Sequence, residues 1–186
     1  LALTRLQGDP SRALAPEAFA ARTAALAQRS LELADGFLAL ARAEAIERTS
    51  FESFDLRDAL QDALDETWAS ARERDVALRS AADGGGPWPV RGHRGLLARA
   101  LINLLGNAIR HAPAGSVVEL DGRRDGRDWE LRVIDAGRGI EPGLRGRLFG
   151  RFQRGADAAG RREHGGAGSQ AGSVGLGLAF VRVVAT

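Results

Sequence analysis

Two asparagines and two basic residues recur at intervals of four in one helical segment, as Arg99, Asn103, Asn107 and His111. On a helix this spacing places them on one face. An asparagine amide oxygen is a hard, neutral ligand that suits Mg²⁺ when phosphates and waters complete its coordination. A solvated polar face is the commoner use of an isolated Asn-x-x-x-Asn pattern, so the segment needs support from other motifs.

Asp135 follows a strand pattern in which Trp129 and Val133 alternate with charged residues, so we expect its carboxylate on the apolar side. A carboxylate in that position needs a hydrogen-bond donor, and the exocyclic amine of adenine is one. Gly137 and Gly139 would let a flat base approach the backbone closely. The alternative is an aspartate that caps its own turn.

The third segment of interest, Gly172 to Leu178, is rich in glycine and leads into an apolar helix pattern. Closely spaced glycines before a helix expose backbone amides and the positive end of the helix dipole to an anion. A dinucleotide-binding motif is a poor match, because that motif lies between a strand and a helix near the start of a βαβ unit. Between these glycines and Asp135, Phe149 and Phe152 read as apolar anchors. Arg151 and Arg154 could reach phosphates, although solvated arginines are the commoner use of such residues.

The composition excludes several ways of handling phosphate. The chain has 186 residues, is 44% hydrophobic and carries a formal net charge of +2. Every basic residue other than histidine is arginine, which excludes the lysine of Walker-type loops and of serine/threonine kinases. No cysteine is present, which excludes thiolate chemistry. The pI of about 10.6 accompanies this small net charge and is a poor argument for nucleic acid binding.

Hydrophobic periodicity predicts a long helix from Pro16 to about Ile46, with two apolar stripes that require more than one partner helix. One stripe is the seam Ala20, Ala24, Ala27, Leu31, Ala34, Leu38, Ala41 and Ala45. Leu1 to Gln7 is expected to be the tail of a preceding helix. The remaining predicted elements are strands at Phe51–Phe54, Val76–Leu78, Ser116–Arg124 and Arg127–Ile134, and helices at Leu56–Ala71, Arg94–Ala112 and Leu176–Val184.

Taken together and in order, these segments resemble the N, first glycine, phenylalanine and second glycine boxes of bacterial sensor histidine kinases, from about Phe51 to the end of the chain. The resemblance implies an α/β two-layer sandwich of the Bergerat type, with a mixed, mostly antiparallel sheet backed by helices. It divides the chain into residues 1–49, part of a dimerisation and phosphoacceptor helical hairpin, and residues 50–186, a catalytic ATP-binding domain whose last strands are absent.

The same resemblance assigns roles to individual residues. Asn107 would bind Mg²⁺, Asp135 would hold the adenine amine, and the segment 150–172 would form a lid over ATP. The other residues implied at the nucleotide are Asn103, Arg110, His111, Gly137, Gly139, Arg151, Gly175, Leu176, Gly177 and Leu178. No catalytic residue is identified in this chain, because the acceptor histidine of such kinases is expected upstream of Leu1.

The implied activity is that of a protein histidine kinase, which transfers the ATP γ-phosphoryl to a histidine and onward to an aspartate on the receiver domain of a response regulator. The implied setting is a homodimer formed through the helical hairpin, in the cytoplasmic part of a membrane-anchored sensor. No stretch approaches the length of a membrane span, so the anchor is expected outside this chain. Other ATPases of the same superfamily, a degenerate nucleotide-binding or dimerisation module, and a nucleic acid binder are the alternatives.

Overall fold

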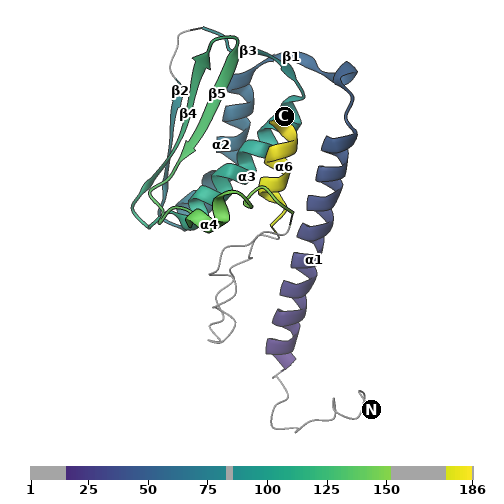
Figure 1. Cartoon of the computed structure of the whole chain (residues 1–186). Helices are drawn as coiled ribbons and strands as arrows, with labels where there is room; N and C mark the ends of the chain where they lie inside the picture. Colours follow the sequence, from purple (N-terminus) through teal and green to yellow (C-terminus); the bar gives the residue numbers. More distant parts are fainter. Residues whose placement is uncertain (1–15, 83–85, 152–174, 186) are drawn as a thin grey trace.

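The computed structural model describes residues 16–82, 86–151 and 175–185 (Figure 1). The predicted tail of a preceding helix and residues 152–172 of the predicted lid lie outside these residues. The helical elements are α1 (Pro16–Ala45), a 3₁₀ turn η3 (Arg48–Ser50), α2 (Leu56–Glu73), α3 (Arg94–His111), α4 (Pro142–Arg145) and α6 (Gly177–Val184). The strands are β1 (Glu52–Asp55), β2 (Ala77–Ala82), β3 (Pro89–Gly92), β4 (Val117–Asp125) and β5 (Asp128–Ile134).

The strands form a three-stranded sheet in the order β2-β4-β5 and a two-stranded sheet, β1-β3. β2 runs parallel to β4, whereas β4 and β5, and likewise β1 and β3, are antiparallel. Helices α2 and α3 cover one face of the larger sheet, and α6 packs on α3 (Figure 1). This arrangement confirms the predicted α/β sandwich with a mixed, mostly antiparallel sheet backed by helices.

The main core lies between the sheet and the helix pair α2 and α3. Its largest fully buried side chains are Leu56, Leu105, Ile109, Val118 and Leu120. On β4 the buried positions alternate with more exposed ones, as expected for a strand with one face on the core. Helix α3 buries its apolar stripe here, which leaves its asparagine-bearing face turned toward α6 and the turn after β5.

Local sequence signals explain where the elements begin and end. Asp55 caps α2 by accepting a hydrogen bond from the Arg57 amide, and it also accepts one from the Trp88 amide beside β3. His93 caps α3 through Nδ1. Gly126 has a φ of 59° in the tight turn between β4 and β5, as the Asp-Gly pair predicts.

Several elements differ from the sequence prediction, among them the 3₁₀ turn η3, which was not predicted, and β1, which lies one residue further along the chain. Strand β2 begins one residue later and runs to Ala82, while β3 and α4 were not predicted at all. Strand β3 begins at Pro89, and proline argues against a strand in a sequence pattern, although it is tolerated in edge strands such as this one. Among the described residues, no helix is long and apolar enough to cross a membrane.

Helix α1 buries a face that matches neither of its two predicted apolar stripes, apart from Leu40. Ala39, Leu40 and Ala43 are buried against α3 and α6, while Leu31 and Leu38 of the predicted seam are 60% and 54% exposed. At 100° per residue, the seam lies on the side of α1 opposite the buried residues. One face of the helix is therefore docked on this chain and the other is open.

Candidate functional site

The face of α3 that carries the asparagines meets the start of α6. A Cβ built on Gly177 would lie 3.1 Å from Asn103 Oδ1, closer than side chains normally approach. Leu176, which caps α6, makes no side-chain cap hydrogen bond. Glycine at 177 thus lets the amide-rich start of a helix come directly beside an asparagine amide, and such helix starts attract anions.

Asn107 lies one turn further along α3, beside Arg110. Arg110 Nη1 donates a long hydrogen bond of 3.5 Å to Asn107 Oδ1, and both residues are half-buried. Burial lowers the pKa of Arg110, the positive charge of Arg74 adds to this, and Glu32 opposes it. A guanidinium that is poorly solvated and close to other cations is suited to pairing with an anion such as a phosphate.

The turn after β5 closes onto the end of α3. Gly137 donates its amide to Asp135 Oδ1 at 2.8 Å. A Cβ on Gly137 would lie 2.6 Å from that oxygen and 2.9 Å from the His111 carbonyl oxygen. Only glycine fits between the aspartate and the end of the helix, so the turn and the asparagine face are held together.

Asp135 is exposed, which corrects the expectation that strand alternation places it on the apolar side. The reason is that β5 ends at Ile134, so the alternation of the strand no longer sets the direction of the next side chain. The bond from Gly137 shows the aspartate capping its own turn. That geometry agrees with the alternative interpretation of the motif, in which the aspartate caps its own turn. It is also compatible with a contact between the carboxylate and a base.

His111 lies where the two segments meet. Partial burial lowers the pKa of its imidazole, with further lowering by the positive charges of Arg110 and Arg138, while Asp135 opposes the shift. These surroundings favour the neutral imidazole over the protonated one. Arrival of a polyphosphate beside it would favour the protonated form.

We call the place where α3, the turn after β5 and the start of α6 meet the junction. The other predicted site residues lie around this junction or beyond it. Gly139 and Gly175 have positive φ values of 75° and 78°. Leu176 is buried, Leu178 is half-buried, and Arg151 forms an ion pair with Glu44 of α1. That ion pair was not predicted, because nothing in the sequence links two residues so far apart.

The donors present fit a magnesium ion that is held mainly by nucleotide. Among residues 16–82, 86–151 and 175–185, no group of three or more His, Asp or Glu side chains is placed to hold a metal. Asn107 offers a single neutral oxygen, one helical turn from the asparagine that meets the start of α6. A magnesium ion that keeps waters and phosphate oxygens needs no more than this from protein.

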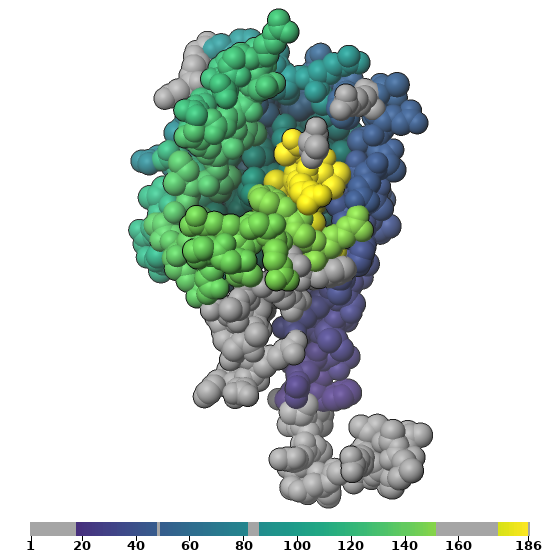
Figure 2. Space-filling view, viewed as in Figure 1, coloured from purple at the N-terminus to yellow at the C-terminus, as the bar shows by residue number. Residues whose placement is uncertain are grey.

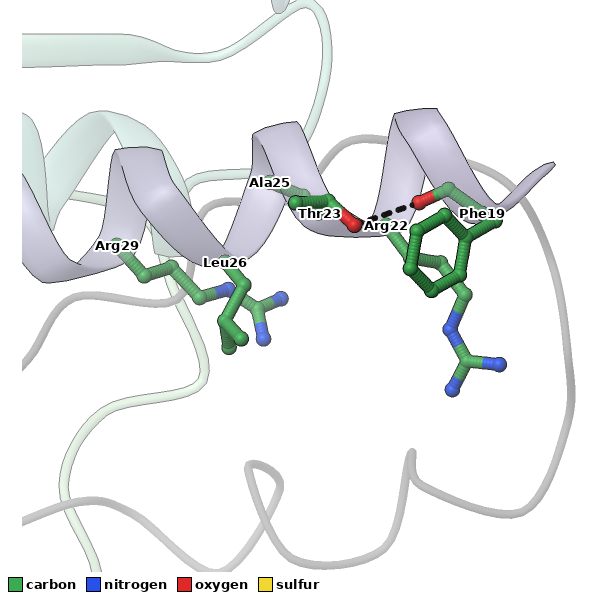
Figure 3. Close-up of a pocket in the computed structure, with 6 residues that line it drawn as sticks. All are labelled: Phe19, Arg22, Thr23, Ala25, Leu26 and Arg29. Atoms are coloured by element: carbon green, nitrogen blue, oxygen red, sulfur yellow. Dashed lines mark hydrogen bonds between the residues drawn. The ribbon is translucent and has the colours of Figure 1, made fainter. Parts of the chain in front are cut away.

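The N-terminal half of α1 carries a separate shallow pocket, drawn in Figure 3. It is lined by Phe19, Arg22, Thr23, Ala25, Leu26 and Arg29. The Thr23 hydroxyl donates to the Phe19 carbonyl oxygen at 2.9 Å, within the helix. None of these residues belongs to the predicted nucleotide site, so this surface is a different feature of the molecule.

The sequence of residues 92–186 matches the family described as "Histidine kinase-, DNA gyrase B-, and HSP90-like ATPase". The chain belongs to this family. Its matched region contains α3, the turn after β5 and α6, the elements that meet at the junction described above. The family resemblance inferred from the four boxes is therefore confirmed.

Named relatives of this chain are sensor kinases. The chain is 34% identical over 168 residues to the sensor-like histidine kinase SenX3 of Mycobacterium tuberculosis, covering 90% of this chain and 38% of SenX3. The mycobacterial sensor histidine kinase MprB has a solved structure that is 29% identical with a TM-score of 0.55, over 72% of this chain and 77% of that one. Full-length ShkA, in complex with AMPPNP, is 27% identical with a TM-score of 0.66, over 94% of this chain and 35% of ShkA.

Proposed function

We propose that this chain is the ATP-binding catalytic part of a two-component sensor histidine kinase. In the intact protein, the γ-phosphoryl of ATP passes to a histidine outside this chain and then to an aspartate on the receiver domain of a response regulator. The chain spans 38% of the length of SenX3, so the activity of the whole protein is inferred from its relatives.

The observation that carries the proposal is the convergence of three motifs along the C-terminal half of α3. Gly177 brings the start of α6 against Asn103, and Gly137 brings the Asp135 turn against His111. Motifs that are far apart in sequence thereby share one site. A nucleotide with its base at Asp135 and its phosphates at α6 would span this junction, and the structure of the relative ShkA is a complex with AMPPNP, an ATP analogue.

Each residue has a stated role in this proposal. Asp135 accepts from the adenine amine, with Gly137 and Gly139 bordering the base. Asn107 holds Mg²⁺, which supplies charge neutralisation at the phosphates when bound. Asn103, Arg110, His111, Arg151 and the amides from Gly175 to Leu178 surround the phosphates, so catalysis by this chain is positioning and electrostatic stabilisation.

Helix α1 belongs to the proposed dimerisation hairpin, with residues 1–49 forming part of that hairpin and residues 50–186 the catalytic domain. The exposed side chains of Leu31 and Leu38 support a homodimer, because an open apolar seam on a long helix is suited to packing against further helices. In this proposal the chain is a cytoplasmic part of a sensor anchored in the membrane through another region.

Two alternatives make different predictions. Another ATPase of the same family would hydrolyse ATP without a histidine acceptor, and a degenerate module would bind nucleotide weakly or only dimerise. The α1 helix favours the kinase, because a long helix with a second apolar face fits a phosphoacceptor hairpin. An upstream histidine followed by an acidic residue would decide between the kinase and the other ATPases.

The test is calorimetric titration with a non-hydrolysable ATP analogue, with and without Mg²⁺. We expect Mg²⁺-dependent binding by the chain, and its loss in Asp135→Asn and Asn107→Ala. Asp65→Asn is the matched control, because this exposed carboxylate of α2 accepts a hydrogen bond from Gln61 far from the junction. No binding by the folded wild-type chain would contradict the proposal.

A second measurement separates binding from phosphotransfer. Incubated alone with ATP, this chain should remain unlabelled, because the acceptor histidine is not part of it. Acid-labile, base-stable phosphate on the chain itself would overturn this assignment of roles.

A further inference from the structure

The helix that carries the site asparagines, α3, begins at a histidine. His93 directly precedes the first helical residue, and its extended backbone, with φ −110° and ψ 102°, is typical of a helix cap. Its imidazole Nδ1 accepts a hydrogen bond of 3.3 Å from the Leu96 amide. The ring packs over the first turn, since a Cβ built on Gly95 would lie 3.4 Å from Cε1 and 3.6 Å from Nδ1. The start of α3 therefore depends on a side chain that can change its charge.

The first turn of α3 packs against both buried clusters of the protein. Leu96 packs against the cluster that contains Leu40 of α1 and Phe180 of α6. Helices α1 and α6 lie side by side at the surface in Figure 2. Leu97 packs against the main core between the sheet and its helices. A looser first turn would therefore weaken contacts on two sides of α3.

Only an unprotonated Nδ1 can accept the hydrogen bond from Leu96. A protonated imidazole carries a hydrogen on each ring nitrogen and is a donor at both. Its positive charge would also lie at the positive end of the helix dipole, where a cation is unfavourable. Histidine is the side chain whose ordinary charge change falls between about pH 5 and pH 8. Protonation within this range would remove the cap.

The charged groups near the start of α3 offer a protonated His93 no partner. Those of the elements that meet here are Arg94 of α3, Asp58 and Asp62 of α2, Arg91 of β3 and Glu52 of β1. Arg94 pairs with Asp62 at 2.7 Å and lies 3.9 Å from Asp58, so the two aspartates are occupied. Within the part of the chain that the structure describes, no carboxylate forms an ion pair with the imidazole.

We propose that His93 is a pH-sensitive cap, which holds the start of α3 while its imidazole is neutral and releases it on protonation. The folded state keeps the unprotonated form, so the stability that the cap contributes is present at basic pH. It is lost as the pH falls through the range in which the imidazole titrates. The cap needs no nucleotide, so its test is independent of the proposed function.

The test compares urea unfolding of the wild-type chain, His93→Asn and His93→Ala from about pH 8 to about pH 5. Asparagine caps a helix throughout this range, whereas alanine has no acceptor. We expect the wild type to be more stable than His93→Ala at the basic limit and no more stable than it at the acidic limit. Between the limits, the ratio of folded to unfolded chain should fall about fivefold more in the wild type than in His93→Asn.

The difference between these proteins isolates His93, because every other titrating group, His111 included, is common to all three. A constant difference between the wild type and His93→Asn would show that protonation leaves the cap in place, and it would overturn the inference. A wild type that equals His93→Ala at every pH would also overturn it, because the imidazole would then not cap α3 in solution. Circular dichroism without urea checks that each protein is folded. If His93→Ala does not fold, the comparison with His93→Asn decides alone.

Discussion

At the scale of single residues, glycines decide how closely the elements approach, in the core as well as at the site. Trp88 and Trp129 stack with ring centres 4.4 Å apart and planes 20° apart. A Cβ on Gly122 of β4 would overlap the Trp88 ring. The stack is therefore possible only because β4 has no side chain at this point.

Gly122→Ala should lower the free energy of unfolding by about 1–3 kcal/mol, the usual range for overpacking a filled core. Urea denaturation followed by tryptophan fluorescence measures this. Gly106→Ala is the control, because a Cβ there meets no atom within 4 Å and alanine favours a helix interior by about 1 kcal/mol over glycine. A loss of stability in Gly106→Ala equal to that in Gly122→Ala would contradict the steric explanation.

Candidate site residues could be predicted from the sequence where a short, regular spacing of residue types indicates their chemistry. The four-residue interval of Asn103 and Asn107 and the glycines around Asp135 could be read directly. The exposed position of Asp135 could not, because it depends on where β5 ends. The ion pair of Arg151 with Glu44 was also out of reach, since only the folded chain brings those two residues together.

At the scale of elements, Asp55 joins β1, α2 and β3. Its carboxylate accepts from the Arg57 amide and side chain and from the Trp88 amide. The hydrogen bond from the Arg57 side chain is the main cause that holds the pKa of Asp55 well below its ordinary range. The folded state therefore favours the ionised form, and the junction of three elements depends on that charge.

The sign of the pH effect follows from the lowered pKa. The stabilisation is fully present above the ordinary pKa of an aspartate and is lost as the pH falls from there toward the lower pKa of the folded state. Asp55→Asn should therefore reduce stability at pH 7, and the difference from the wild type should shrink as the pH falls below about 4. Urea midpoints measured across pH test this, with Asp65→Asn as control. A difference that stays constant with pH would contradict it.

Long elements with strong periodicity were predictable, and short ones were not. Helices α2 and α3 and the β4–β5 hairpin match their predicted positions closely, because each carries an apolar repeat over many residues. Strand β3 has only four residues, begins with proline and gains its place by pairing with β1. Its existence depends on a partner distant in sequence, which no local pattern encodes.

At the scale of the whole molecule, α1 has one face on its own chain and one face open. The division of the chain into a hairpin part and a catalytic domain stays a prediction. If the prediction holds, the chain should self-associate in solution, because association covers exposed apolar side chains of the seam such as Leu31 and Leu38.

Leu31→Glu with Leu38→Glu should abolish self-association of the chain, because it places two charges in the seam. Sedimentation velocity over a concentration series measures this. Ala25→Glu is the control, since it adds charge at an exposed position on the side of α1 away from the seam, and it should leave association unchanged. A wild-type chain that remains monomeric at all concentrations would contradict the dimer proposed through this surface.

Gly36 and Leu176 lie close together in the folded chain, but the ribosome adds them to the chain at widely separated times. Helix α1 emerges early in synthesis, whereas α6 emerges only after the sheet and α3 are complete. Contacts between distant parts of a chain form late, because closing a long loop costs entropy before the contact stabilises it. During synthesis both faces of α1 are therefore open, and a neighbouring nascent copy can reach this helix before its own α6 exists.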